Sequence, residues 1–158
     1  LEGHSDRVLS VAWSPDGKFI ASGSEDNTIK LWSNKGKELK TLEGHKGAVL
    51  SVAFNPQENI IASASIDGTV KLWSFGDKAK TGKFDAEELQ TLNGHNGWAT
   101  SVAWSSDGKT LISASDHKTL IVWNLEDLKL EKLMKAACAQ VKDYLEHNAE
   151  ESEKDLCE

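Results

Sequence analysis

Residues 1–33 read LEGHSDRVLSVAWSPDGKFIASGSEDNTIKLWS, and close copies of this stretch occur twice more in the chain. Residues 42–74 read LEGHKGAVLSVAFNPQENIIASASIDGTVKLWS and align with it without a gap, at 20 identical positions of 33. The third copy, LNGHNGWATSVAWSSDGKTLISASDHKTLIVWN, covers residues 92–124. A period of about 40 residues is typical of folds that stack copies of one small unit.

Each copy alternates apolar and polar residues in short runs, which indicates β-strands separated by turns. In the first copy we expect strands at 8–13, 19–24, 28–33 and 37–41. Ser14-Pro15-Asp16-Gly17 between the first two is typical of a type I turn. Short antiparallel sheets of this kind cannot cover their own apolar faces, so the copies must stack as blades.

The motifs shared by the copies are Gly-His, S-V-A-[WF] and L-W or V-W, with S-x-S-x-D-x-T-[IV] in the first two. They resemble the WD40 repeat family over residues 1–124. The resemblance implies an all-β fold, a partial WD40 β-propeller of three blades of antiparallel four-stranded sheets, bounded as 1–41, 42–91 and 92–124. The last blade is expected to lack its outer strand, because the pattern becomes helical after Trp123-Asn124, where the family usually has Trp-Asp.

Each copy also contains a His, a Ser and a turn Asp or its substitute, residue types that a catalytic triad would need. The WD40 resemblance implies a structural role instead, in which a Trp indole donates to a strand hydroxyl, the hydroxyl bonds to the His, and the His bonds to the Asp. Such a network is favourable because a buried polar group without a partner costs about 1–3 kcal/mol. The expected members are His4, Ser22, Asp26 and Trp32; His45, Ser63, Asp67 and Trp73; and His95, Ser113, His117 and Trp123.

Two points in this network stay open at the level of sequence. Ser24 points to the same face as Ser22 and is an alternative hydroxyl. In the third copy His117 stands at the Asp position and Asp116 lies one residue early. A neutral His117 could accept a proton from His95, so we predict a weakened network in this blade.

Nothing in the sequence favours catalysis. Three near-identical constellations argue against one active site, and the chain has no GxSxG, no GxxxxGK[ST] and no metal-binding His spacing. We therefore predict no enzyme activity, no metal and no cofactor. Cys138 and Cys157 have no metal-like spacing and are expected to be free thiols.

Partners of WD40 proteins commonly bind where the loop before the first strand meets the turn after the second. Arg7 and Trp98 stand out among the equivalent positions because Arg and Trp are enriched in binding hot spots. The alternative for each is plain surface, or for Leu9 and Leu50 a lining of the ring. The positions implied by the resemblance are Arg7, Leu9, Glu25, Ala48, Leu50, Ile66, Trp98, Thr100 and Asp116. The residues added between Trp73 and His95 are expected to form a loop on the opposite rim.

The net charge of −7 lies mainly in residues 125–158, which hold ten acids against five lysines. No basic stripe is present for nucleic acid or an anionic membrane, so other proteins or peptides are the expected partners. The sequence has no signal-like start and no apolar run of membrane-spanning length, which makes a cytoplasmic setting the expectation.

Residues 125–158 form a helical C-terminal tail by pattern, with an amphipathic helix expected from about Glu126 to His147-Asn148. The helix could cover the propeller or bind a partner. The tail resembles the end of large cyanobacterial WD-repeat proteins, which implies the last blades of a longer protein. We expect a protein-interaction scaffold or sensor module; the alternative is the regulatory end of a signalling NTPase or kinase.

The number of blades predicts how the chain assembles. Propellers close with typically 4 to 8 blades, so three blades need others to form a ring. The missing blades could come from a parent chain. For the chain itself we predict a homodimer of six blades.

Overall fold

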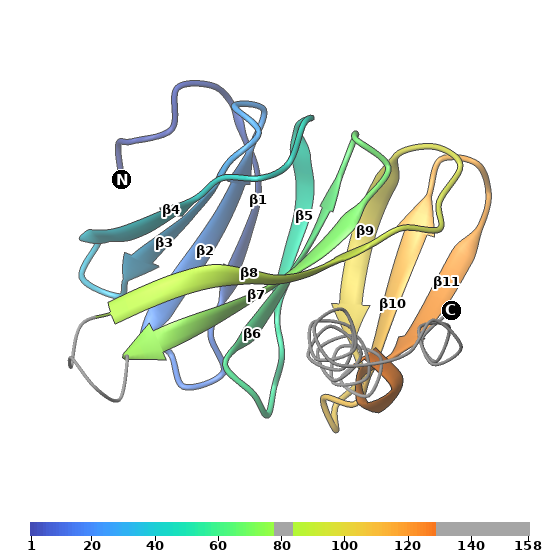
Figure 1. Cartoon of the computed structure of the whole chain (residues 1–158). Coiled ribbons are helices and arrows are strands. Elements are labelled where there is room, and N and C mark those ends of the chain that lie inside the picture. The colour runs from blue at the N-terminus through green and yellow to red at the C-terminus, as the bar shows by residue number, and fades with distance from the viewer. Residues whose placement is uncertain (78–83, 129–158) are drawn as a thin grey trace, which may run out of the picture. The chain divides into compact units, whose positions relative to one another are not determined.

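The computed structural model describes residues 1–77 and 84–128. Its strands form three antiparallel sheets, in which neighbours along the chain are neighbours in the sheet (Figure 1). The first sheet contains β1 (Val8–Trp13), β2 (Phe19–Ser24), β3 (Ile29–Ser33) and β4 (Glu38–Leu42). The second contains β5 (Val49–Phe54), β6 (Ile60–Ser65), β7 (Val70–Asp77) and β8 (Phe84–Leu92). The third contains β9 (Ala99–Trp104), β10 (Thr110–Ser115) and β11 (Leu120–Asn124).

These sheets, named blades 1 to 3 in chain order, confirm the predicted all-β partial propeller. Blade 3 has three strands within the described residues, as expected. The chain divides into two compact units, Leu1–Trp123 and Asn124–Glu158. In the second unit residues 125–128 are helical, and the remainder of the predicted helix, with both cysteines, lies outside the described residues.

A loop was expected for the residues added in the second repeat, but within the described residues part of this segment extends the β7–β8 hairpin. Strands β7 and β8 stay paired to Asp77 opposite Phe84. The physical reason is apolar burial, since Phe75 and Ala86 lie opposite each other in this pair and both join the core. The extension therefore adds packing surface to blade 2.

Strand alternation gives each blade two faces. The front face carries the Trp, Ser and His of the expected network, and the back face is the other side. Cross-strand pairing puts Val11, Trp13, Ile20, Ser22 and Trp32 on the front face of blade 1, and Ser10, Ala12, Ala21, Ile29 and Leu31 on its back face.

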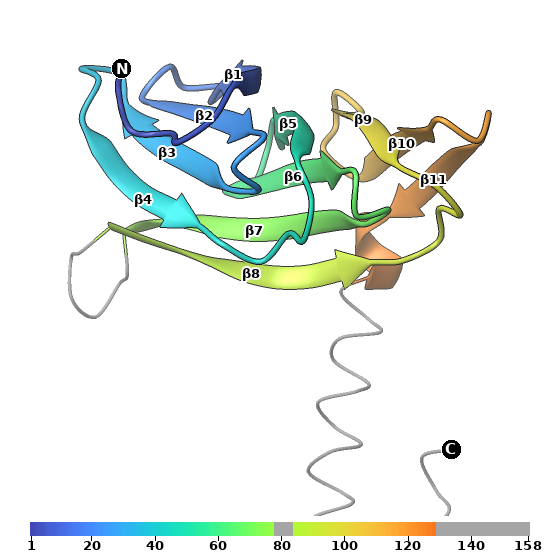
Figure 2. The ribbon, with the colours of Figure 1, turned by 90° about the horizontal axis from the view of Figure 1, so that it is seen from above.

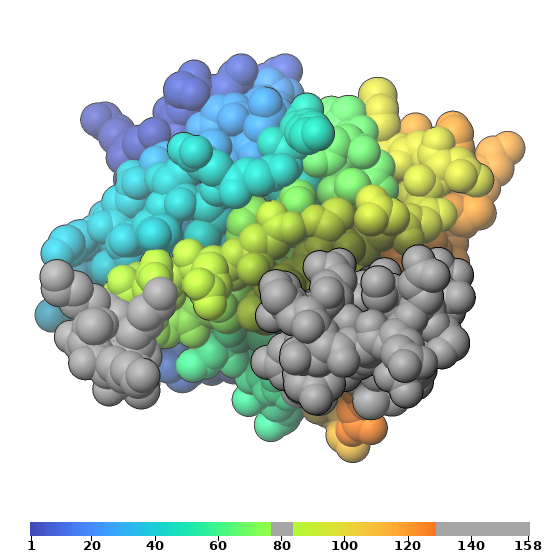
Figure 3. Space-filling view, in the orientation of Figure 1, coloured from blue at the N-terminus to red at the C-terminus, as the bar shows by residue number. Residues whose placement is uncertain are grey.

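The blades stack front to back. Strand β1 lies beside β5, and β5 lies beside β9, so the first strand of each blade is innermost (Figure 2). The core fills the space between blades 1 and 2 with Ala21, Ile29 and Leu31 from one blade and Val52, Phe54 and Ile61 from the next. On the outer side β4 runs along β8 (Figure 3). At this contact Lys40 Nζ lies 3.0 Å from Asp85 Oδ1.

Candidate protein-binding site and the polar network beneath it

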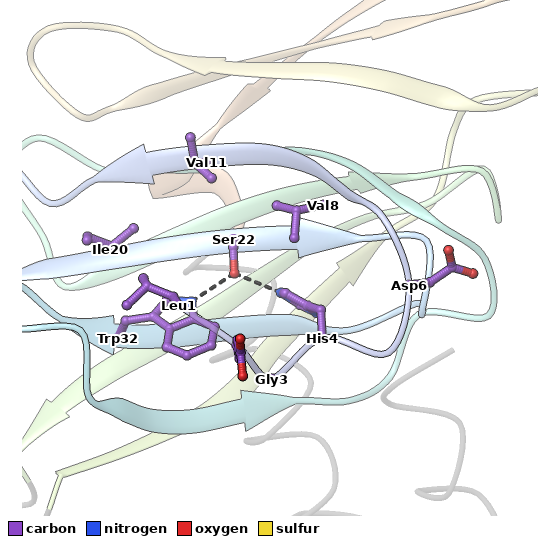
Figure 4. Close-up of a pocket in the computed structure, with 10 residues that line it drawn as sticks. Leu1, Gly3, His4, Asp6, Val8, Val11, Ile20, Ser22 and Trp32 are labelled. Carbon is purple, nitrogen blue, oxygen red and sulfur yellow. Dashed lines mark hydrogen bonds between the residues drawn. The ribbon is translucent and has the colours of Figure 1, made fainter.

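In blade 1 one serine hydroxyl lies between a tryptophan and a histidine. Trp32 Nε1 donates to Ser22 Oγ over 2.8 Å, and His4 Nε2 lies 2.8 Å from the same oxygen (Figure 4). His4 Nδ1 is in turn 2.8 Å from Asp26 Oδ2. These bonds connect β3, β2, the N-terminal loop and the turn after β2.

Blade 2 repeats this arrangement with nearly the same distances. Trp73 Nε1 donates to Ser63 Oγ over 2.9 Å, His45 Nε2 lies 2.8 Å from Ser63 Oγ, and His45 Nδ1 lies 2.9 Å from Asp67 Oδ2. The hydroxyl of Ser65, two residues further along the strand, donates instead to Gly47 O over 2.8 Å. Ser24 bonds similarly to Asp6 O, so the geometry favours Ser22 and Ser63 as the network hydroxyls.

Sequence reasoning missed one member of this network, the threonine two residues after each turn Asp. Thr69 donates to Asp67 Oδ1 through both Oγ1, at 2.7 Å, and its backbone N, at 2.9 Å. Thr28 does the same for Asp26. The D-x-T spacing, which the sequence repeats, was the available signal.

These contacts determine the ionisation states of Asp67 and His45. Burial raises the pKa of Asp67, but hydrogen bonds from Thr69, the Lys46 amide and His45 outweigh burial and hold that pKa at about 2. Burial lowers the pKa of His45 and outweighs the opposite effect of Asp67. A neutral His45 can donate from Nδ1 to the carboxylate and accept the Ser63 hydroxyl at Nε2. Ser63 is fully buried and also accepts an indole N–H, an arrangement that suits a structural hydrogen bond.

Blade 3 keeps only half of the network. Trp123 Nε1 donates to Ser113 Oγ over 2.9 Å, and His95 Nε2 lies 2.7 Å from that oxygen. Within the part of the chain that the structure describes, His95 Nδ1 is buried and has no hydrogen-bond partner. The prediction that His95 bonds to His117 is therefore wrong.

The two residues at the turn of blade 3 explain this difference. The His117 side chain is exposed and its ring lies beside Gly97, away from His95 Nδ1. The Asp116 carboxylate lies 3.2 Å from the hydroxyl of Ser115 and does not bind His95.

We expect His117→Asp to stabilise the protein by about 1–3 kcal/mol, because a carboxylate would satisfy the buried His95 Nδ1. The other partners are in place, since Thr119 stands where Thr28 and Thr69 stand in the first two repeats. Denaturant unfolding measures the gain. NMR titration gives a second readout: burial lowers the pKa of His95 in the parent chain, and the new carboxylate should raise it. An unchanged midpoint together with an unchanged pKa would contradict the assignment.

The residues expected to contact a partner lie at one edge of each blade. Backbone bonds join the loop before the first strand to the turn after the second: Glu25 N to Arg7 O at 2.9 Å, Ile66 N to Ala48 O at 3.0 Å, and Asp116 N to Trp98 O at 3.3 Å. The loops leading into β5 and β9 and the β6–β7 and β10–β11 turns share the upper edge in Figure 1. We call the edge formed by these loops and turns the loop edge.

Side chains on the loop edge differ in how far they are exposed to solvent. Trp98 is 50% exposed, and Arg7 is exposed while holding Glu25 through two contacts of 2.7 and 2.8 Å. Leu9 is exposed, and Leu50, Ile66 and Thr100 are half-buried. Ala48 is buried, so it can contribute little to a partner.

The described residues also bear on metal binding and membrane spanning. No group of three or more His, Cys, Asp or Glu side chains is arranged to hold a metal ion there. No helix in that part of the chain is long and apolar enough to cross a membrane.

Stacked antiparallel sheets with their first strands side by side define an arc of β-propeller blades. The family model described as "WD domain, G-beta repeat" matches residues 1–33, 36–74 and 86–124. The chain therefore belongs to the WD40 repeat family.

Relatives share single repeats with this chain. A vegetative incompatibility protein, HET-E-1 of Podospora anserina, is 66% identical over 32 residues, which are 20% of this chain and 2% of that protein. A probable cytosolic iron-sulfur protein assembly protein, the CIAO1 homolog of Chlamydomonas reinhardtii, is 54% identical over 35 residues, 22% of this chain and 10% of the relative. The transcriptional repressor tup12 of Schizosaccharomyces pombe is 64% identical over 31 residues, 20% of this chain and 5% of the relative. The matches thus span a tenth or less of these relatives.

Proposed function

We propose that the chain is a non-catalytic, cytoplasmic protein-interaction module that binds a partner protein or peptide on the loop edge, with Trp98 as the main anchor and Arg7 as a charged one. The observation that carries the proposal is the exposure of Trp98 at an edge where loops from three repeats converge. A large apolar ring left half in water gains most from being covered by a partner.

Variation among the repeats supports this choice of surface. The position of Trp98 holds Arg7 in the first repeat and Ala48 in the second, while the network residues beneath are nearly the same in the first two repeats. A position that only served packing would be expected to repeat with the packing. The differing side chains instead suit one asymmetric partner that contacts each blade differently.

The charges on the loop edge indicate which side chains a partner would carry. Glu25 and Asp116 lie beside Arg7 and Trp98 respectively in the backbone-paired loops. Basic and apolar side chains on the partner would be complementary to the acidic positions and to the indole. The buried Ser22 and Ser63 hydroxyls, already engaged by tryptophan and histidine, argue against hydrolysis as the function. A regulatory role beside a signalling NTPase or kinase would use the same surface.

We expect Trp98→Ala to weaken binding of the partner by at least about 30-fold, which corresponds to the roughly 2 kcal/mol of a hot-spot residue. The partner is first isolated by quantitative affinity capture with the parent chain, and its dissociation constant is then measured by calorimetry. Arg7→Ala should weaken binding to a smaller extent, because its guanidinium is already paired with Glu25.

The matched control is Lys18→Ala, which removes an exposed cation from the β1–β2 turn, where Lys18 pairs with Asp16 at 3.1 Å. This turn lies at the end of the blade opposite the loop edge, so affinity should not change. Equal affinities for the parent chain and Trp98→Ala would refute the proposed surface, and a loss in Lys18→Ala would place binding at the opposite edge.

A further inference from the structure

A groove lies between the β1–β2 turn of blade 1 and the β5–β6 turn of blade 2, at the edge opposite the loop edge (lower edge in Figure 1). Its volume is about 190 Å³. This volume is below the roughly 300–1,000 Å³ of pockets that take whole small molecules, and it suits one side chain of a partner. We call it the turn groove. Its lining includes Pro15, Asp16, Phe19, Pro56, Asn59 and Phe75.

The next seam along the chain shows why this groove is open. Between blades 2 and 3 an asparagine bridges the equivalent turns, since Asn55 Nδ2 donates to Gly108 O over 2.8 Å. Ser14 stands at the Asn55 position of blade 1. Its shorter side chain donates within its own turn, to Asp16 Oδ1 over 2.7 Å. A hydroxyl engaged in this way cannot bridge the turns of blades 1 and 2, so space remains between them.

Two phenylalanine rings give the turn groove an apolar part. Phe19 and Phe75 come from different blades, and their ring centroids lie 5.6 Å apart in edge-on geometry. Phe75 is buried and also lies 5.2 Å from the ring of Phe54, so its position is fixed by packing. Aromatic rings attract cations, and they also pack well against the aliphatic stem of a long basic side chain.

The charges of the turn groove are acidic. Of the described residues that line it, the charged ones are Asp16 and Glu58. Hydrogen bonds from the Ser14 hydroxyl and the Lys18 amide hold the pKa of Asp16 at about 2, so this carboxylate is ionised at neutral pH. Its Oδ2 lies 3.1 Å from Lys18 Nζ, in a pair whose side chains are both open to solvent. Exposed pairs of this kind are weak, so another cation can compete for the carboxylate.

We propose that the turn groove binds an arginine side chain of a partner protein. The guanidinium donates to the Asp16 carboxylate, and its stem packs on Phe19 and Phe75. Exposed amide groups of Gln57 and Asn59 are placed to accept its remaining N–H groups. Arginine suits this site better than lysine because it carries five donors and a flat, weakly hydrated face. The groove is distinct from the loop edge, so the chain has a second binding surface.

The test is an NMR titration of the full chain with an acetylated glycine-arginine-glycine amide, carried into the millimolar range because one side chain binds weakly. We expect saturable amide shifts confined to residues 14–18 and 57–59. Peptides with leucine or glutamate in place of arginine should bind at least about fivefold more weakly, because they cannot make a charge-assisted hydrogen bond to the carboxylate. Absence of shifts at these residues, or equal binding of the leucine peptide, would overturn the proposal.

Variants of the charged pair test the role of Asp16. Asp16→Asn should weaken binding of the arginine peptide by at least about threefold. The matched control is Asp107→Asn, since Asp107 accepts the same kind of turn bonds in blade 3, from the Ser105 hydroxyl and the Lys109 amide, and does not line the groove. Lys18→Ala should tighten binding, because it removes the competing cation. Equal losses in Asp16→Asn and Asp107→Asn, or weaker binding in Lys18→Ala, would contradict the assignment.

A further variant narrows the groove without changing its charge. Ser14→Asn introduces the longer side chain that bridges the turns at the other seam, so the peptide shifts should disappear while circular dichroism stays that of the parent chain. Unchanged binding in this variant would place the arginine elsewhere. Trp98→Ala should bind the arginine peptide as the parent chain does. Failure of the loop edge and failure of the turn groove are therefore seen in different variants.

Discussion

Replacing Phe75 with alanine is expected to lower the free energy of unfolding by about 3–5 kcal/mol, the usual cost of removing a buried aromatic ring. Phe75 is 8% exposed. Its ring lies 5.2 Å from that of Phe54 in its own blade and 5.6 Å from that of Phe19 in blade 1, both in edge-on geometry. The substitution would therefore open a cavity at the seam between the two blades.

Phe75→Leu is the matched control, because it keeps apolar volume and removes only the ring contacts, for an expected loss below about 1.5 kcal/mol. Both variants are compared with the parent chain by denaturant unfolding at one fixed protein concentration, since association would otherwise shift the midpoint. A loss below about 1 kcal/mol for Phe75→Ala would mean that blades 1 and 2 do not meet at this ring.

His45→Ala is expected to cost about 2–4 kcal/mol, because it leaves the Ser63 hydroxyl and the Asp67 carboxylate without their shared partner. The free energy of unfolding should be measured near pH 7. The pKa of His45 is lowered by burial, so the ring is neutral there and its contribution to stability is present; that contribution decreases as the pH falls below 6.5.

His95→Ala is the control for this second prediction, since it removes the same side chain from a blade that lacks the carboxylate contact. Its cost should be clearly smaller than that of His45→Ala. Equal losses in the two variants would show that the bond to Asp67 adds nothing, and the account of the network would then be wrong.

Repetition explains how much of the fold could be predicted from sequence. Alternation within each copy places the strands of the first repeat to within one residue of β1 to β4, because side chains of a half-buried strand must alternate. The stacking order of the sheets follows from the same repetition, since the apolar faces of each copy must pack against a neighbouring copy. The extended hairpin of β7 and β8 has no counterpart in the other repeats. Its extension places Phe75 in contact with Phe19 of blade 1, a contact between blades that the pattern within one repeat does not encode.

The candidate site was predictable where the copies agree and not where they differ. Ser22 and Ser24 have the same side-chain type and strand face, and only the loop position decides which of them reaches His4. The His117 ring lies beside Gly97, and no local pattern in the sequence encodes this placement. The exposure of Trp98 likewise depends on its neighbours in space, so its role on the loop edge stays a prediction.

The most direct test of protein binding on the loop edge is the hydrogen-exchange footprint of the captured partner on this chain. We expect slowed amide exchange in the complex at residues 4–7, 95–98 and 116–118, with smaller changes at 45–48. Protection confined to the opposite turns, residues 14–17, 55–59 and 105–108, with free exchange around Trp98, would contradict it.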